Sequence, residues 1–293
     1  MKIPMTLYIW LSLMTFRARS SQLRFQATRA PEETLAGAYV INLDSKKEAY
    51  TAFQARMGSI LPFAGVSSVQ RHPGVLATVD GFPPQWARSL LPDMYNGAGG
   101  RGTLGCTLAH MSLWKKVGDS AECRGPGGAD RFALIFEDDE RPNTNFRHGL
   151  EATLRILGSH PDGWRPDYVN LNALRPLGGT TWEVIPHAAW LATIPKEWNR
   201  YLGQVGGKSQ NVWASLYLVR CGSIGKLLHE FASGYDGVHP YNDWRISDLL
   251  FSRNSSLVGG VIIPTNAFSL HEHEMSSRLE LDGTTTDWGD IHK

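Results

Sequence analysis

Short apolar runs alternate with segments of helical periodicity along most of the chain. Residues 38–43 form the first such run and predict a short buried strand. The next segment predicts a helix, because its apolar residues recur at helical spacing. These residues are Ala49, Phe53, Met57 and Ile60. Ser45 and Glu48 have the spacing of a capping box at the start of that helix, so the pattern opens as an α/β unit.

The same alternation continues toward the carboxyl end. Helices are expected at residues 103–117, 145–157 and 222–231. Short strands are expected within 68–76 and at 132–136, 168–171, 212–219 and 257–263. The run at 132–136 is apolar without interruption, which suits a central strand buried on both faces.

Two segments are expected to be loops. Residues 97–102 match the pattern G-x-G-x-x-G, but no strand precedes them, so a flexible loop is expected rather than a dinucleotide site. Residues 176–210 combine aromatic residues with Gly and Pro and are expected to form a long loop over a functional site.

The order of elements predicts an α/β fold in a single domain, with a mixed and mostly parallel sheet flanked by helices. The chain has 293 residues, of which 42% are hydrophobic, so it can bury one large core. The domain is expected over residues 36–275, between an N-terminal targeting or flexible segment at 1–35 and a polar tail at 276–293.

The N-terminal segment has features of a targeting signal. Residues 3–16 are mostly apolar but too short to cross a bilayer, and they have the length of a signal-peptide core. The following residues are Arg-rich and free of acids before Glu32, as in organelle transit peptides. A secretory signal or short anchor, a transit peptide and an ordinary N-terminal segment all remain open. We expect the lumen of the secretory pathway, with membrane association only through this segment.

Charge and cysteine content narrow the possible partners. The net charge is +1, so no basic excess points to nucleic acid. The cysteines Cys106, Cys123 and Cys221 are too few for a disulfide scaffold, but one disulfide plus a thiol is compatible with them. No two of these cysteines have C-x-x-C spacing, so a structural zinc site is not expected.

Four consecutive carboxylates, Glu137, Asp138, Asp139 and Glu140, follow the expected central strand directly. They repel one another, and in open α/β sheets ligands bind at the carboxyl ends of the strands. A divalent cation, Mn²⁺ or Mg²⁺, together with a phosphate-bearing ligand would relieve the repulsion. A nucleotide-sugar donor needs this arrangement, because its diphosphate leaving group must be neutralised. The alternative is a solvated acidic turn that caps the next helix.

Five segments, in order, resemble glycosyltransferase family 25, which includes bacterial lipooligosaccharide and animal procollagen galactosyltransferases. They are residues 39–44, 105–115, 133–139, 214–228 and 240–244. The resemblance implies a GT-A-like fold and the inverting, metal-dependent transfer of a hexose, with galactose as the first choice. The donor would be a UDP-sugar, and the acceptor a hydroxyl of a glycan or glycoprotein. Residues 45–47 and Ala109 depart from the family, which has an arginine-rich stretch and a serine at these places.

The resemblance also implies roles for individual residues. Asp139 is the expected metal ligand. Donor contacts are expected from Asn42, Leu43, Asp44, His110, Glu137 and Asp138.

Inversion requires a base to take the acceptor proton, and Asp243 is the candidate, with Asp248 as the substitute and an ordinary loop or N-cap acid as the alternative. His271 and His273 alternate along an extended segment, so both imidazoles can face one way and one can ligate the metal. The alternative for this pair is a solvent-exposed tail.

Other functions use the same residues. Cys106 and His110 lie four positions apart on one helix face, but a Cys–His nucleophile pair is not favoured, because no oxyanion device accompanies it. A metal-dependent hydrolase could use the acidic cluster with His271 and His273. A non-catalytic member of the same fold, which binds a glycan or a partner, is the remaining alternative.

Overall fold

The computed structural model describes residues 35–76, 100–142, 146–159, 165–171, 182–185, 189–193, 214–232, 245–246, 249–250, 255–264 and 269–271. All of them belong to one compact unit, Glu32–Lys293. Among these residues no helix is long and apolar enough to span a membrane. Apart from Leu35, which is buried in the core, the expected targeting segment and the polar tail lie outside the described residues, so the domain boundaries stay predictions.

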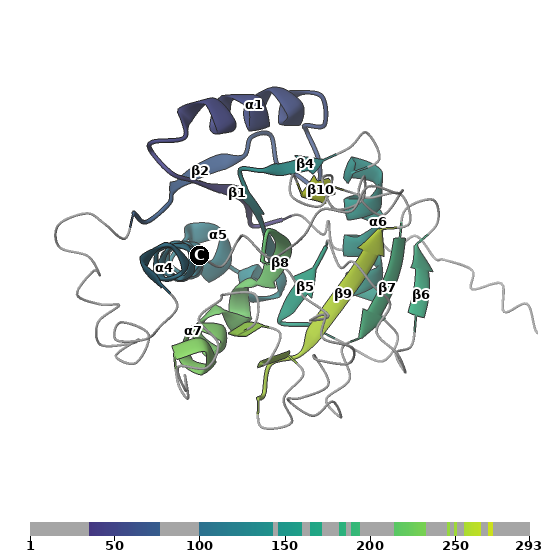
Figure 1. Cartoon of the computed structure of the whole chain (residues 1–293). Coiled ribbons are helices and arrows are strands. Elements are labelled where there is room, and N and C mark those ends of the chain that lie inside the picture. Colours follow the sequence, from purple (N-terminus) through teal and green to yellow (C-terminus); the bar gives the residue numbers. More distant parts are fainter. Residues whose placement is uncertain are drawn as a thin grey trace, which may run out of the picture. The chain divides into compact units, whose positions relative to one another are not determined.

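Eight of the described strands form one mixed sheet in the order β2-β1-β3-β8-β5-β9-β7-β6 (Figure 1). The strands are β1 (Gly37–Asn42), β2 (Gln70–Pro73), β3 (Phe132–Glu137), β5 (Tyr168–Asn170), β6 (Trp182–Ile185), β7 (Ala189–Thr193), β8 (Leu216–Arg220) and β9 (Gly259–Pro264). The strand pairings make β7 and β8 run opposite to the other six. This architecture confirms the predicted α/β fold with a mixed, mostly parallel sheet.

Helices cover both faces of the sheet. They are α1 (Lys47–Gly58), α4 (Gly100–Gly118), α6 (Phe146–Ser159) and α7 (Ile224–Ala232), together with the short α5 (Ala121–Arg124). Alternate residues of β3 enter two separate clusters, because successive side chains of a strand point to opposite faces. Ala133 and Ile135 pack with α4 and α7, whereas Leu134 and Phe136 pack with α1 and α6. The unbroken apolar run therefore reflects a strand buried on both sides, as predicted.

A disulfide ties two segments of the α4 side together. Cys123 in α5 is bonded to Cys221 in the 3-10 turn η3 (Cys221–Ser223), across 98 positions of the chain, with a Cα–Cα distance of 5.3 Å. The turn η1 (Gly128–Asp130) packs closely beside it, because a Cβ on Gly128 would lie 2.6 Å from the carbonyl oxygen of Cys123. The structure thus realises the pattern of one disulfide, with Cys106 outside it.

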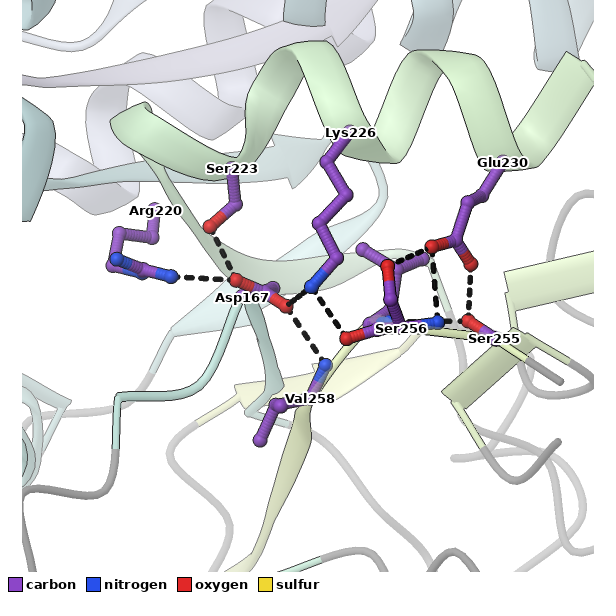
Figure 2. A network of polar contacts seen from close by, with 9 residues as sticks. Asp167, Arg220, Ser223, Lys226, Glu230, Ser255, Ser256 and Val258 are labelled. Atoms are coloured by element: carbon purple, nitrogen blue, oxygen red, sulfur yellow. Dashed lines mark hydrogen bonds and ion pairs between the residues drawn. The ribbon is translucent and has the colours of Figure 1, made fainter. Parts of the chain in front are cut away.

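The network in Figure 2 closes the edge of the sheet where β5 begins and β8 ends. Asp167 is 2% exposed and accepts hydrogen bonds from Arg220 at 2.6 Å, Lys226 at 2.7 Å, the Val258 amide at 2.8 Å and the Ser223 hydroxyl. Burial acts to raise the pKa of Asp167, but these four donors outweigh it and hold the pKa below its usual value. The ionised carboxylate therefore joins β5, β8, α7 and the start of β9.

Glu230 of α7 extends this network to the chain before β9. It accepts a 3.0 Å hydrogen bond from the Ser256 amide and further bonds from the hydroxyls of Ser255 and Ser256 (Figure 2). Burial acts to raise the pKa of Glu230, but the serine donors and Lys226 outweigh it and lower the pKa. Residues 255–258 are thereby fixed against α7.

The predicted capping box is not formed. Helix α1 starts at Lys47, and its N-cap Lys46 makes no side-chain capping bond. The chain turns instead through backbone contacts, because the Lys46 amide donates to the Leu43 carbonyl and Asn42 Nδ2 donates to the Lys46 carbonyl at 2.8 Å. A side chain from the end of β1 therefore fixes the turn before α1, but it donates to a carbonyl and so does not cap the free amides of the helix.

Two predicted loops are partly wrong. Helix α4 begins at Gly100, so residues 100–102 are helical despite their glycines. Its later turns are buried at Leu108, Met111 and Trp114, and this packing outweighs the weak local propensity. Within the long segment 176–210, β6 and β7 form an antiparallel pair that extends the sheet beyond β9. Pairing with a distant strand, rather than local periodicity, decides this structure.

Candidate functional site

The acidic cluster lies at the carboxyl end of the central strand. β3 ends at Glu137, Asp138 and Asp139 form a turn, and Glu140 begins the short strand β4 (Glu140–Pro142). Ile41 of β1 is paired in parallel with Glu137, so the carboxyl ends of β1 and β3 meet at one edge of the sheet. The structure places these acids where ligands bind in open α/β folds.

Asn42, the last residue of β1, connects this turn to two other elements. Its Nδ2 donates to Asp138 Oδ2 at 2.6 Å and to the Lys46 carbonyl at 2.8 Å. Its Oδ1 accepts from Arg71 Nε of β2 at 2.8 Å, which fixes the orientation of the amide. Arg71 also pairs with Asp44, which follows β1. Asn42 is buried, so its hydrogen bonds hold Asp138 in one position.

The side chain of Arg56 in α1 supports the same turn by binding backbone carbonyls of the turn. Its guanidinium donates to the carbonyl oxygens of Asp138 at 3.3 Å and Glu140 at 3.1 Å. The positive charge also lies beside the carboxylate cluster and reduces the repulsion within it.

A chain of hydrogen bonds from the core reaches Glu137. Trp114 Nε1 donates to Tyr217 Oη at 2.8 Å, and Tyr217 Oη lies 2.7 Å from His110 Nδ1. His110 Nε2 lies 3.0 Å from Glu137 Oε1. An ionised carboxylate only accepts, so we assign the histidine proton to Nε2 and the Tyr217 proton to the bond with Nδ1. Cys106, one turn before His110 on α4, contributes its sulfur at 3.6 Å from the same carboxylate oxygen.

Burial and neighbouring charges change the acidity of this region. Burial raises the pKa of Asp138, the negative charges of Asp139 and Glu137 add to the rise, and Asn42 and Lys46 oppose it. Burial also lowers the pKa of His72 on β2 to about 4, with help from Lys116 and His110, so His72 is neutral at physiological pH. A bound cation would favour the ionised form of Asp138.

A hollow lies beside the end of β1. It has a volume of about 480 Å³ and is lined by residues 44–49, at the turn after β1 and the first turn of α1. This volume lies within the range of small-molecule sites. The lysines Lys46 and Lys47 on its wall offer positive charge to an anionic ligand group. Asn42 connects the hollow to the acidic turn through Lys46 and Asp138.

The structure gathers the residues expected around the donor. Asn42 ends β1 and is followed directly by Leu43 and Asp44, and His110 reaches Glu137 at the start of the acidic turn. His271 lies in β10 (Ser269–His271), which pairs antiparallel with β4, so its backbone stands opposite Glu140. His271 is thus next to the acidic cluster in the fold. Asp243, Asp248 and His273 lie outside the described residues.

Three residues that support the site carry no signal in the sequence pattern. Arg56, Arg71 and Tyr217 each reach it from a different element, α1, β2 and β8. Their roles depend on contacts across 29 positions or more, which periodicity and spacing do not report.

The donor set suits a hard divalent cation. Carboxylate oxygens are the ligands that Mn²⁺ and Mg²⁺ prefer, and Asp138 and Asp139 present them in a turn braced by Asn42 and Arg56. The donor type therefore agrees with such an ion, while the ligand atoms that converge within the described residues are those of Cys106, His110 and Glu137.

Comparison with known proteins gives one relevant similarity. No protein-family model matches the chain. Over 101 residues, or 33% of its length, the chain is 31% identical to the human protein named inactive glycosyltransferase 25 family member 3. The matched segment covers only 16% of that relative. The similarity supports a distant relation to glycosyltransferase family 25 and selects no subfamily.

Proposed function

We propose that this protein transfers a hexose from a UDP-sugar to an acceptor hydroxyl in a metal-dependent, inverting reaction. The observation that carries the proposal is the acidic turn after β3, held by Asn42 and Arg56 beside a lysine-lined hollow. Similarity to a member of glycosyltransferase family 25 supports a distant relation to that family, although the human relative is itself named inactive.

In this proposal the metal is held by Asp139, with Asp138 beside it. When bound, Mn²⁺ or Mg²⁺ supplies positive charge to the diphosphate leaving group. Asn42 keeps the Asp138 carboxylate turned toward the sheet edge, and Arg56 keeps the turn in place through its carbonyls. His271 is the candidate additional ligand because β10 brings its backbone next to Glu140, and His273 follows two residues later.

The donor would lie along the carboxyl ends of β1 and β3. Asp44 lines the hollow after β1 and Leu43 precedes it in the chain, and His110 and Glu137 lie on the α4 side of the proposed donor site. Lys46 and Lys47 take over the electrostatic task of the family's arginine-rich stretch. Galactose is the first donor sugar to test, and Asp243 is the proposed base that takes the acceptor proton.

We place the protein and its glycan or glycoprotein acceptor in the secretory pathway, because the chain contains a disulfide. The Cys123–Cys221 disulfide is buried, and structural disulfides persist in oxidising compartments. This supports the location that the apolar N-terminal segment predicts.

A second candidate is a binding protein that has kept the fold without turnover. The human relative is named inactive, and residues 45–47 lack the arginines of the family. Such a protein would bind a glycan or partner without using a donor.

Calorimetric titration of the full chain with UDP, with and without Mn²⁺, tests the proposal. Metal-dependent binding that Asp139→Asn abolishes and Asp130→Asn retains is the expected result, because Asp130 is an exposed acid in η1. Product analysis with UDP-galactose and an acceptor then separates transfer from hydrolysis. Metal-dependent UDP binding of equal affinity in Asp139→Asn would contradict the metal assignment. Binding of a glycan with no UDP affinity would favour the second candidate.

A further inference from the structure

Three side chains that can bind metals lie close together beside the acidic turn. The sulfur of Cys106, a nitrogen of His110 and a carboxylate oxygen of Glu137 all lie within 4.8 Å of one another. Helical spacing places Cys106 and His110 on one face of α4, and β3 delivers Glu137 to that face. We propose that these three residues form a site for Zn²⁺, separate in chemistry from the oxygen-ligand site of Asp138 and Asp139.

The spacing of the ligand atoms suits this ion. With bonds of about 2.3 Å to sulfur and about 2.0–2.1 Å to nitrogen or oxygen, the ligand atoms of a tetrahedral Zn²⁺ site lie about 3.3–3.6 Å apart. The structure has 3.0 Å between His110 and Glu137 and 3.6 Å between Cys106 and Glu137. Two of the three separations are within a few tenths of an ångström of a loaded site.

The ligand types select zinc over the harder cations. A thiolate combined with an imidazole suits Zn²⁺, whereas Mg²⁺ and Mn²⁺ favour sites made mainly of oxygen ligands and without a thiolate. Cys106 is exposed while His110 is fully buried, so the site is anchored in the core and open toward solvent. Three protein ligands with an open fourth position are the arrangement of zinc sites that accept a water or another ligand.

The partners of His110 allow its ring to change role. Tyr217 Oη already accepts from Trp114 Nε1, and if its own proton rotates out of the bond with Nδ1, its second lone pair can accept a hydrogen bond from Nδ1–H. Zinc binding moves the histidine proton from Nε2 to Nδ1, which leaves Nε2 to the metal, and the Cys106 thiol loses its proton to solvent. Tyr217 then serves as the outer partner that orients a metal-bound histidine.

This site does not rest on transferase activity, and cobalt spectroscopy tests it directly. Co²⁺ replaces Zn²⁺ in such sites, and a Co²⁺–thiolate bond absorbs in the near ultraviolet. Cys123 and Cys221 are joined in the disulfide, so Cys106 is the thiol that can produce this band in the oxidised full chain. The titration is made without reductant and with excess Mg²⁺ to occupy the acidic turn.

We expect a thiolate–cobalt band that saturates at one equivalent, is bleached by Zn²⁺ and is lost in Cys106→Ser. Replacing either other ligand, by His110→Gln or Glu137→Gln, should weaken Co²⁺ binding at least about tenfold. Asp139→Asn and the exposed-surface control His229→Gln should retain the band. Cys106→Ser changes an exposed side chain, so loss of folding does not obscure that comparison.

Two results would overturn the proposal. One is the absence of a thiolate–cobalt band in the wild-type chain. The other is a band whose affinity is the same after His110→Gln and Glu137→Gln, since Cys106 would then bind cobalt without the other two ligands.

Discussion

Asn42 and Asp138 lie 96 positions apart in the sequence and are joined by a 2.6 Å hydrogen bond from Nδ2 to Oδ2. The bond ties the end of β1 to the acidic turn after β3. The Asn42 side chain also donates to the Lys46 carbonyl and accepts from Arg71 Nε. This single amide therefore links three parts of the candidate site by hydrogen bonds.

Replacing Asn42 by Ala should loosen the acidic turn. A hydrogen bond to a charged group contributes about 1.5–3 kcal/mol, so we expect metal-dependent UDP affinity to fall roughly 10- to 100-fold. Calorimetry at fixed Mn²⁺ measures this change. Gln54→Ala, at an exposed position of α1, is the control and should bind as the wild type does. Unchanged affinity in Asn42→Ala would show that the turn holds its shape without this bond.

Replacing Asp243 by Asn should separate binding from chemistry. The loss of a general base typically costs 10²- to 10⁴-fold in rate, so turnover should fall by about that factor while UDP affinity stays normal. Steady-state transfer assays together with UDP calorimetry measure the two effects. Asp248→Asn is the matched comparison. If Asp248→Asn is the slow variant and Asp243→Asn turns over normally, the two assignments must be exchanged.

Asp167 should make folding stability depend on acid pH. Its folded pKa is below the ordinary value of 3.8, so its contribution is complete above that value and is lost as the pH falls through the folded pKa. At neutral pH, Asp167→Asn should lower the free energy of unfolding by about 2–3 kcal/mol, because Arg220 and Lys226 lose their shared partner. The gap from the wild type should narrow below pH 3.8.

Urea unfolding at several pH values measures this gap. The exposed Asp119→Asn variant, whose partners Lys115 and Arg124 lie on the surface, should stay close to the wild type. Asp167 lies at the start of β5, at the opposite sheet edge from the acidic turn, so UDP binding should not change. A pH-independent gap would mean that Asp167 acts through packing rather than charge.

The disulfide should contribute substantially to stability. By the chain-entropy model, cross-linking a loop of this length stabilises the fold by about 4–5 kcal/mol. The double variant Cys123→Ser/Cys221→Ser should therefore unfold at a much lower urea concentration, with Cys106→Ser as the control. Thiol titration of the denatured, unreduced chain should find one reactive cysteine of the three. Three reactive thiols would rule the disulfide out.

Much of the local structure was predictable because it depends on neighbouring residues. The apolar run of β3 and the helical spacing of Phe53 and Met57 in α1 both report burial that the sequence pattern encodes. The acidic cluster could be placed at a strand end because it follows that run directly. The resemblance to glycosyltransferase family 25 rests on the same short segments.

The exceptions show where local signals compete with distant contacts. Ser45 has the chemistry and spacing of a cap, yet α1 begins after Lys46 without a side-chain cap, and the distant contact from Asn42 fixes the turn before it. Gly100 and Gly102 have low helix propensity, yet they belong to a helix anchored by its buried later turns.

By itself, the sequence determined the α/β class, most of the strands and helices and the position of the four acids after the central strand. Only the tertiary structure decided the order of strands, the Cys123–Cys221 pairing and the convergence of Asn42, Arg71 and His110 on the acidic turn. Periodicity records whether a residue is buried, but it does not record which distant residue it meets. Those long-range contacts follow from how the elements pack, and the candidate site is built from such contacts.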